Sequence, residues 1–169
     1  VASIPLSTME AFEPQHGAWV GVTPMPHGRS HMGVAVLDDK IYVLGGMGDD
    51  YFACSTVDVY DPQTNTWATA PPMGTLRRSH AVAALGGKIY VAGGYDNGAN
   101  GRNVLRISSV EAYDPLTKSW ATVAPMSTAR GDQFSLTVVR GKLYATGGGT
   151  EANDVLATVE AYDPQQNRW

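Results

Sequence analysis

The chain is poor in cysteine, in long apolar runs and in basic residues, and each of these shortages excludes a class of protein. Cysteine occurs once in 169 residues, which excludes an internal disulfide framework and suits a reducing compartment. We find no signal peptide and no apolar run long enough to span a membrane. Basic residues are also scarce, with 12 Lys and Arg against 16 Asp and Glu. A general nucleic-acid binder needs a basic surface. We therefore expect a cytoplasmic protein with neither a nucleic-acid nor a membrane partner.

What the chain does contain is a motif that occurs four times: an aromatic residue, an acid and a proline, then a turn and a tryptophan. The tryptophans recur about every 50 residues. Such a period indicates a repeat architecture, in which each unit buries its core by stacking against its neighbours. The copies begin at Phe12, Tyr60, Tyr113 and Tyr162 and end at Trp19, Trp67, Trp120 and Trp169.

A second block precedes each of the last three tryptophans. It contains an arginine segment, a short apolar run, and a lysine-led apolar run that ends in two glycines. The apolar runs are rich in β-branched residues and tyrosine and are bounded by glycine, which indicates buried strands. No segment keeps an apolar period of 3.6 residues. We therefore predict an all-β fold.

Each complete repeat is predicted to contain four strands, which we call A to D. Two-residue links of the kind found in primed hairpin turns join strands A and B: Asp38-Asp39, Gly86-Gly87 and Arg140-Gly141. Strands C and D are joined through the Asp-Pro turn, and the residue two before each tryptophan is expected to be left-handed. Asn and Gly suit that conformation, whereas Lys118 does not. The four residues are Gly17, Asn65, Lys118 and Asn167.

The order of these landmarks resembles the kelch repeat. Arg-Ser-His, a strand, Ile-Tyr-Val-x-Gly-Gly, Val-x-x-Tyr-Asp-Pro and Trp follow one another, and the match covers nearly the whole chain. The resemblance implies a kelch-type β-propeller, in which four-stranded antiparallel blades surround a central channel.

The repeat pattern divides the chain into four parts, about 3.5 blades in all. Residues 1–25 match the C-terminal half of a blade, 29–72 and 78–125 are kelch repeats, and 130–169 is a kelch repeat that lacks the end of its last strand. Propellers close with about four to eight blades. We expect the rest of a parent chain to complete the ring; the alternative is a second copy of this chain.

The two ends of the blades differ. The A–B and C–D turns fall at one end and are short, whereas the B–C and D–A connections fall at the other end and differ in every copy. Variation confined to one face of a repeat array is typical of a binding face. The kelch resemblance implies partner contacts through these two loop sets. The candidate partner-binding residues are Arg29, Ser30, His31, Arg77, Arg78, Ser79, His80, Tyr95, Asn97, Arg102, Arg130 and Thr150.

The arginines have two interpretations. A ring of Arg29, Arg78 and Arg130, one per repeat, would attract acidic peptides at the channel mouth. The favoured interpretation is that an arginine recurring once per repeat braces the D–A turn or pairs with a neighbouring blade's carboxylate. Arg77 and Arg102 have no counterpart in the other copies and are less suited to bracing.

No catalytic or metal-binding motif stands out. His31 and His80 occupy equivalent positions in adjacent repeats, with His27 near, but a metal site also needs carboxylate or thiolate partners that converge with them. Repeat-equivalent histidines more often end a strand on the rim, so no metal or other cofactor is expected. Cys54 lies in a variable loop and is interpreted as an incidental thiol, with a redox sensor as the alternative.

We therefore expect a non-catalytic protein-interaction module that binds a protein or peptide partner. In proteins that resemble this one, such propellers often follow a BTB or F-box region and present substrates to a ubiquitin ligase. The alternative is a carbohydrate-binding or sugar-converting kelch enzyme, similar to sialic-acid mutarotases. There, Arg102, Arg130 and Glu151 would hold a charged sugar, and a histidine at the rim would move protons.

Overall fold

The computed structural model describes residues 5–96, 104–132, 134–150, 152 and 155–169, and its regular elements are all strands. The all-β prediction is therefore confirmed. No helix long and apolar enough to cross a membrane occurs in these ranges.

Two four-stranded antiparallel sheets lie at the centre of the chain. The first has the order β3 (Gly33–Leu37), β4 (Lys40–Leu44), β5 (Val57–Asp61), β6 (Thr66–Ala70). The second has the order β7 (Ala81–Leu85), β8 (Lys88–Ala92), β11 (Val110–Asp114), β12 (Ser119–Val123).

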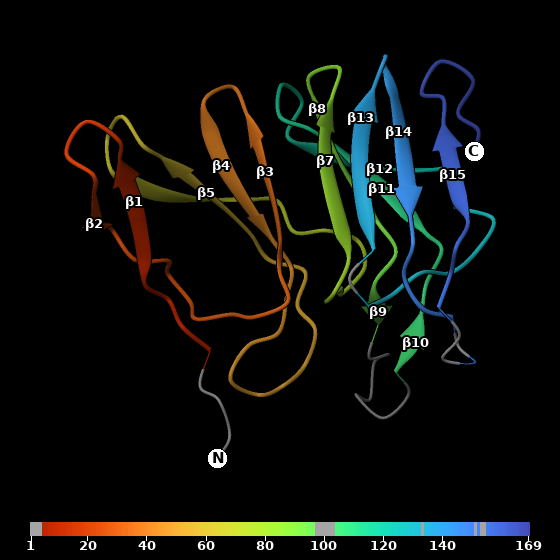
Figure 1. Ribbon diagram of the computed structural model, residues 1–169, viewed down its shortest axis with the longest axis horizontal. Helices are drawn as coiled ribbons and strands as arrows, with labels where there is room; N and C mark the ends of the chain where they lie inside the picture. The colour runs from red at the N-terminus through yellow and green to blue at the C-terminus, as the bar shows by residue number, and fades with distance from the viewer. Residues whose placement is uncertain (1–4, 97–103, 133, 151, 153–154) are drawn as a thin grey trace.

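Smaller sheets flank these two. The strands β1 (Met9–Glu13) and β2 (Ala18–Val22) pair on the N-terminal side. On the C-terminal side a three-stranded sheet contains β13 (Ser135–Val139), β14 (Lys142–Thr146) and β15 (Val159–Tyr162). A short ribbon of β9 (Tyr95–Asp96) and β10 (Leu105–Arg106) projects from the second four-stranded sheet. The sheets lie side by side in chain order (Figure 1). Each sheet falls within one of the four ranges predicted from the sequence, 1–25, 29–72, 78–125 and 130–169. The exact boundaries of the repeats stay a prediction.

The A–B turns have the predicted geometry. Asp38 and Asp39 have φ of 50° and 57°, and Arg140 has 49°. Positive φ at both central residues is the type I′ hairpin turn, whose twist matches that of the flanking strands. These turns lie at one end of the sheets, and the loops after β4 and β8 lie at the other (Figure 1). The predicted separation of short turns from variable loops is therefore confirmed.

The sheets are held together by aromatic side chains on their inner faces. Tyr42 on β4 packs against Tyr113 on β11, with ring centroids 6.2 Å apart, and Tyr90 contacts Tyr162 in the same way at 5.8 Å. The innermost strands β3, β7 and β13 pack against one another in sequence. Each blade therefore completes its core with its neighbour's side chains, as expected of a repeat fold.

Tryptophan fixes the spacing between neighbouring sheets. The indole Nε1 of Trp67 donates to the Thr23 carbonyl at 2.9 Å, and that of Trp120 donates to the Pro71 carbonyl at 2.8 Å. Trp169 makes the equivalent bond to Ala124 at 2.8 Å. Thr23, Pro71 and Ala124 are thus equivalent positions in successive repeats.

The left-handed residue of the C–D turn adds a second link at two of these three junctions. Asn65, with φ of 54°, accepts hydrogen bonds at Oδ1 from the backbone N–H of Thr23 at 2.9 Å and from the Tyr60 hydroxyl at 2.8 Å. Asn167 makes the same two bonds. At the middle junction Lys118 is left-handed with φ of 51°, and its partner position is Pro71, which has no N–H.

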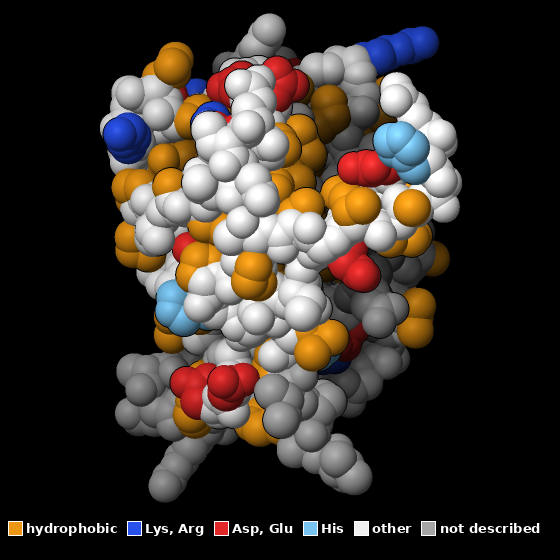
Figure 2. All heavy atoms as spheres, turned by 90° about the vertical axis from the view of Figure 1, so that its left-hand side faces the viewer, with side chains coloured by type: hydrophobic (Ala, Val, Ile, Leu, Met, Phe, Trp, Pro, Cys, Tyr) orange, Lys and Arg blue, Asp and Glu red, His pale blue; other side chains and the backbone are white. Residues whose placement is uncertain are grey.

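Figure 2 looks onto the side of the molecule formed by β1 and β2, where hydrophobic side chains are visible between polar groups. Phe12 packs against Trp19 with ring centroids 5.4 Å apart, but Phe12 is 48% exposed. In the three later repeats the equivalent tyrosines are buried. The packing pattern of the later sheets thus depends on a preceding sheet.

Candidate interaction rim

The rim is the end of the molecule where the B–C loops and the D–A connections meet. Each D–A connection pairs with the start of a B–C loop, through bridges between Ser30 and Met47, Arg78 and Tyr95, and Gly131 and Gly149. These bridges define the equivalent positions of the three repeats without reference to sequence similarity.

The glycine pairs make this close approach of backbones feasible. Gly46 has φ of 100°, and a Cβ at this position would lie 2.7 Å from the Ser30 carbonyl oxygen. Gly94 has φ of 92°, and its Cβ would lie 2.6 Å from the Arg78 carbonyl oxygen. Both the conformation and the space therefore require glycine.

The equivalent positions correct the predicted register of the arginines. Because Arg78 is equivalent to Ser30 and Gly131, the counterpart of Arg29 and Arg130 is Arg77. The prediction that Arg78 recurs and Arg77 has no counterpart was wrong. The similarity of Arg29-Ser30-His31 to Arg78-Ser79-His80 misaligned the two repeats by one residue.

The three recurring arginines are buried braces. Arg77 is 0% exposed and donates through Nη2 to Glu111 at 2.8 Å, through Nη1 to the Gly93 carbonyl at 3.0 Å, and to Ser109. Glu111 in turn accepts from the backbone N–H groups of Gly74 at 2.7 Å and Thr75 at 3.2 Å. One ion pair thus joins strand C, the Gly-Gly segment and the D–A connection of the same repeat.

The next repeat has the same arrangement. Arg130 is 0% exposed and contacts Glu160 through Nη2 at 2.8 Å and Nε at 3.1 Å, and the Gly147 carbonyl at 2.6 Å. Burial alone would raise the pKa of Glu160, but hydrogen bonds from Ser127 and Arg130 outweigh it and lower that pKa. The carboxylate therefore stays ionised.

Arg29 is buried as well and pairs with Asp58. The expected ring of exposed arginines at the channel mouth is therefore not observed, because Arg29, Arg77 and Arg130 point into their own blades. The bracing interpretation fits the geometry, with the carboxylate in the same repeat rather than in a neighbouring blade.

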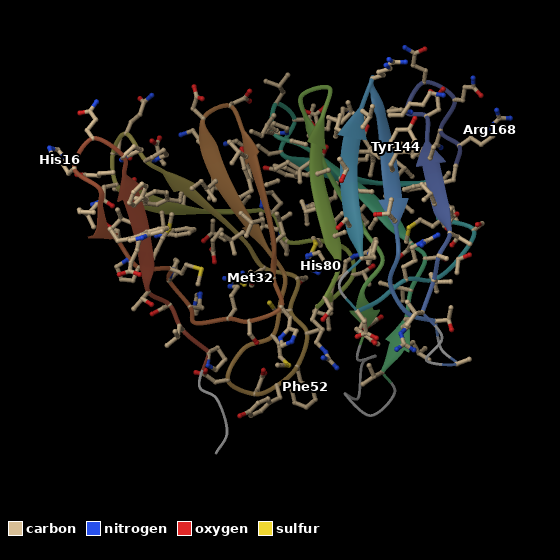
Figure 3. The ribbon with its side chains drawn as sticks, in the orientation of Figure 1. His16, Met32, Phe52, His80, Tyr144 and Arg168 are labelled. Carbon is tan, nitrogen blue, oxygen red and sulfur yellow. The ribbon has the colours of Figure 1, made fainter. Side chains whose placement is uncertain are left out.

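His80 also lies inside the molecule, although its sequence position suggested the rim. Its ring (labelled in Figure 3) lies against Gly33 of β3 and Gly45 just after β4. Met32 and Phe134 take this position in the other repeats. Burial, followed by the positive charge of Arg77, lowers the pKa of His80 to about 3. Neither ring nitrogen forms a well-aligned hydrogen bond within the described ranges, and only the nearby Leu44 carbonyl favours the protonated form. His80 is thus a neutral packing residue.

A polar cluster does lie on the rim, around the Tyr95 ring. Arg78 and Arg106 place their guanidinium carbons 5.2 Å and 5.1 Å from its centroid. The Tyr95 hydroxyl donates to Asp132 at 2.5 Å, and Arg106 Nη2 donates to the same carboxylate oxygen at 2.7 Å. Arg106 also donates to the Thr150 carbonyl. The cluster joins loops of two neighbouring repeats into one ordered surface.

The charges in this cluster are mutually stabilised. Hydrogen bonds from Tyr95 and Arg106 lower the pKa of Asp132, whose side chain is 56% exposed. Burial and the bond to Asp132 raise the pKa of the Tyr95 hydroxyl, so that it stays a donor. Asp132 is therefore the exposed group of the cluster, Arg78 and Tyr95 are half-buried, and the Arg106 side chain, 7% exposed, holds Asp132 in place.

The remaining candidates are distributed as follows. His31 is exposed and lies 3.0 Å from the Ser30 hydroxyl, and Ser79 is half-buried with φ of 52°. Asn97 and Arg102 lie outside the described residues. Sequence reasoning missed Arg106, which lies after the variable loop, and placed Asp132 beside the rim arginines without counting it among the binding residues.

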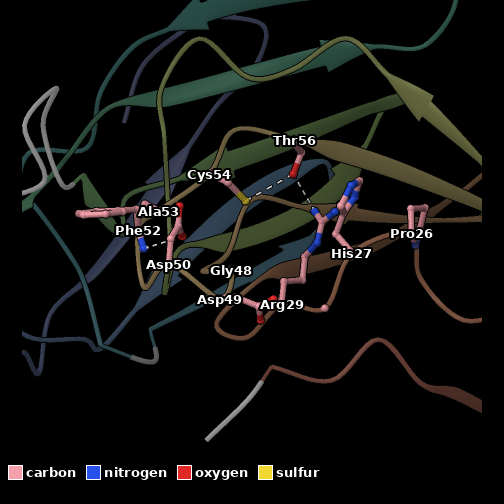
Figure 4. Close-up of a pocket in the computed structure, with 11 residues that line it drawn as sticks. Pro26, His27, Arg29, Gly48, Asp49, Asp50, Phe52, Ala53, Cys54 and Thr56 are labelled. Atoms are coloured by element: carbon pink, nitrogen blue, oxygen red, sulfur yellow. Dashed lines mark hydrogen bonds between the residues drawn. The ribbon is translucent and has the colours of Figure 1, made fainter. Parts of the chain in front are cut away.

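A pocket of about 590 Å³ opens on the rim of the repeat that contains Arg29 (Figure 4). One wall is the D–A connection at Pro26, His27 and Gly28, and the other is the B–C loop from Gly48 to Cys54. The Cys54 thiol lies 3.4 Å from the Thr56 hydroxyl. The described ranges contain no cluster of three His, Cys, Asp or Glu side chains that would hold a metal ion.

This geometry matches a known family of repeat proteins. The family model described as the KLHDC2/KLHL20/DRC7 Kelch-repeats domain matches residues 2–148, and the Kelch motif model matches residues 130–169. The chain belongs to the kelch-repeat family.

Similar kelch proteins come from several vertebrates. Kelch-like protein 36 of Rattus norvegicus is 30% identical over 151 residues, which cover 89% of this chain and 16% of that protein. Kelch-like protein 40 of Xenopus tropicalis is 31% identical over 156 residues, covering 89% of this chain and 24% of that protein. Kelch-like protein 4 of Homo sapiens is 47% identical over 60 residues, or 36% of this chain and 8% of the relative. The kelch chain thus spans less than a quarter of these proteins' length.

A solved structure supports the fold. The structure of YjhT superimposes with a TM-score of 0.81 at 16% identity, over 96% of this kelch chain and 51% of that chain. At this identity the likeness concerns the fold alone. The predicted kelch-type β-propeller architecture is confirmed.

Proposed function

We propose that this kelch chain is a non-catalytic protein-interaction module that binds a partner peptide or domain through the B–C and D–A rim. The observation that carries the proposal is the cluster of Arg78, Tyr95, Arg106 and Asp132, which fixes side chains from two repeats at the variable end of the blades. Aromatic and arginine side chains held in place are the residue types that dominate binding energy at protein interfaces.

The finer form of the proposal is substrate recruitment for a ubiquitin ligase adaptor. Similarity to kelch-like proteins supports this form. An acidic partner has less support than the sequence suggested, because the three recurring arginines are engaged inside their blades. Arg78, which lies over the Tyr95 ring beside Asp132, is the rim arginine that the test below replaces.

The sugar enzyme is a weaker second candidate. Of the residues expected to hold a charged sugar, Arg130 is buried against Glu160, and Arg102 and Glu151 lie outside the described residues. No observation favours this function over protein binding.

The proposal is tested by affinity capture from lysate with wild type, Arg78→Ala and Arg168→Ala, followed by calorimetry with the purified partner. Arg168 lies at the opposite end of the blades (Figure 3) and is the matched control for loss of a surface arginine. We expect Arg78→Ala to weaken binding by roughly tenfold or more, as for an arginine at an interface hot spot, and Arg168→Ala to leave it unchanged. Equal binding by all three proteins would refute the rim as the interface.

A further inference from the structure

The pocket beside Arg29 has a specific structural origin. In the two later repeats the carboxylate of Glu111 or Glu160 fills the corresponding space. Each accepts from the arginine Nε as well as Nη2, at 3.3 and 2.8 Å for Arg77 and at 3.1 and 2.8 Å for Arg130. Each also accepts from backbone N–H groups of the D–A connection, such as Gly74. These repeats show what kind of atom the space accommodates, namely an acceptor oxygen.

In the first complete repeat that oxygen is missing. The acid is Asp58, one methylene shorter than glutamate, and it bonds to Nη2 of Arg29 and to the Thr69 hydroxyl. Pro26 stands where Gly74 and Ser127 donate, and it has no N–H. Within the described residues, the Nε–H of Arg29 and the backbone N–H of His27 make no hydrogen bond. Both residues line the pocket, so a ligand there has two donors within its lining residues that no described protein group accepts from.

The charges of the pocket indicate what kind of acceptor fits. The guanidinium of Arg29 is already neutralised by Asp58, whose side chain is 3% exposed. Asp49 and Asp50 line the same pocket. A ligand carboxylate would therefore face the carboxylates of Asp49 and Asp50, while the lining cation, Arg29, is already paired with Asp58, which is unfavourable. A neutral carbonyl oxygen would accept from the two donors without adding negative charge.

We propose that this pocket binds the side-chain carboxamide of an asparagine or glutamine from the partner. The amide oxygen takes the place that Glu111 and Glu160 occupy in the other repeats, and the amide NH₂ is the donor suited to Asp49 and Asp50. Phe52 and Ala53 provide apolar lining for the aliphatic part of the side chain. The volume is in the range of binding pockets. This inference rests on the proposed function, because it names the side chain that the rim selects.

The test uses four peptides, acetyl-Gly-X-Gly-amide with X as Gln, Glu, Lys or Ala, titrated into the ¹⁵N-labelled protein and followed by NMR. The backbone amides are common to all four, so differences report on the side chain. We expect the Gln peptide to shift the resonances of Gly48, Ala53 and Cys54 and to bind at least fivefold more tightly than the others. Equal or tighter binding of the Glu peptide would overturn the carboxamide assignment.

A double variant, the paired variant, fills the pocket with the same groups that fill the corresponding space in the next repeat. Pro26→Gly with Asp58→Glu recreates the Gly74–Glu111 arrangement, so it should keep the fold and lower the affinity for the Gln peptide at least tenfold. Asp61→Glu is the matched control, because it makes the same extension at the opposite end of the blade. Unchanged Gln binding by the paired variant would also overturn the proposal.

The purified partner separates this inference from the proposed function. If partner binding depends on Arg78 but not on the paired variant, the rim is the interface and the carboxamide pocket is refuted. If partner binding depends on neither, both proposals fail.

Discussion

The junction between the two four-stranded sheets lacks a link that its two neighbours have, and restoring it gives a quantitative test of how the blades are joined. At this junction Lys118 replaces Asn65 and Asn167, and Pro71 replaces Thr23 and Ala124. Asparagine accepts from the neighbouring backbone N–H and from the tyrosine hydroxyl of its own repeat. Lysine cannot accept either bond.

The perturbation is Lys118→Asn, alone and together with Pro71→Ala. Asparagine tolerates the observed φ of 51° better than lysine, and its Oδ1 gains the hydroxyl of Tyr113, so the single variant should be more stable by about 1–2 kcal/mol. Pro71→Ala alone should cost about 0.4–1 kcal/mol, because the unfolded chain gains freedom. Only the double variant has both the N–H and its acceptor, so the coupling free energy should be about 1 kcal/mol in favour of folding.

Urea unfolding of wild type, both single variants and the double variant provides the double-mutant cycle, read from tryptophan fluorescence. Asn65→Lys is the reverse control and should lower the free energy of unfolding by about 2 kcal/mol, since it removes two hydrogen bonds and a favourable left-handed residue. A coupling below about 0.3 kcal/mol is what independent sites show. That result would mean that the asparagine does not join the blades, and the reasoning would be wrong.

Three other changes test the interior and the turns. The folded pKa of His80 is about 3 and its unfolded pKa is about 6.5, so below pH 6.5 the unfolded state binds the proton first and stability falls. His80→Phe, which copies Phe134, should therefore reduce the loss of unfolding free energy between pH 7 and pH 5 by about 2 kcal/mol, measured by urea unfolding at both pH values. Glu111→Gln should cost about 3 kcal/mol or more in the same assay at pH 7, because it leaves the buried charge of Arg77 unpaired; a smaller loss would show that water reaches the guanidinium. Arg140→Asn should raise the thermal midpoint by a few degrees, since Asn-Gly is the preferred type I′ pair; no increase would show that the turn is not strained.

Much of the fold was predictable because it depends on local patterns. The A–B turns and the left-handed residue at Asn65 follow from residue types that few other backbone conformations accommodate. The strands follow from short apolar runs between glycines, and β3 and β4 form where such runs flank Asp38-Asp39.

The placement of the arginines was not predictable from the tripeptide that precedes strand A. Arg77 and Arg78 are adjacent in the sequence, and in the structure Arg77 is the brace because it reaches the buried carboxylate of Glu111. The spacing to the glycine pair contains that signal: Arg29 and Arg77 both donate to a carbonyl 16 residues later, at Gly45 and Gly93. The sequence alignment followed the shared Arg-Ser-His motif instead of this spacing, and therefore matched Arg29 with Arg78 rather than with Arg77.

The rim required three-dimensional information for a different reason. Arg106 has no equivalent in the other repeats, and its contact with Asp132 joins two loops of unrelated sequence. The pocket beside Arg29 arises from one missing methylene at Asp58 and one missing N–H at Pro26. Such small absences have no sequence signature until the neighbouring repeats are superimposed.

The placement of the A–B and C–D turns at one end of the blades has a consequence for how the rim at the other end can change over evolutionary time. The A–B hairpins fix strand register from the far end through pairs such as Leu37–Lys40 and Leu85–Lys88. A longer loop at the rim then costs folding free energy only through the entropy of closing the loop, which rises by about 0.6 kcal/mol for each doubling of its length. Insertions and new sequences can therefore accumulate there with little penalty, so a single scaffold can acquire new specificities while its blades stay the same.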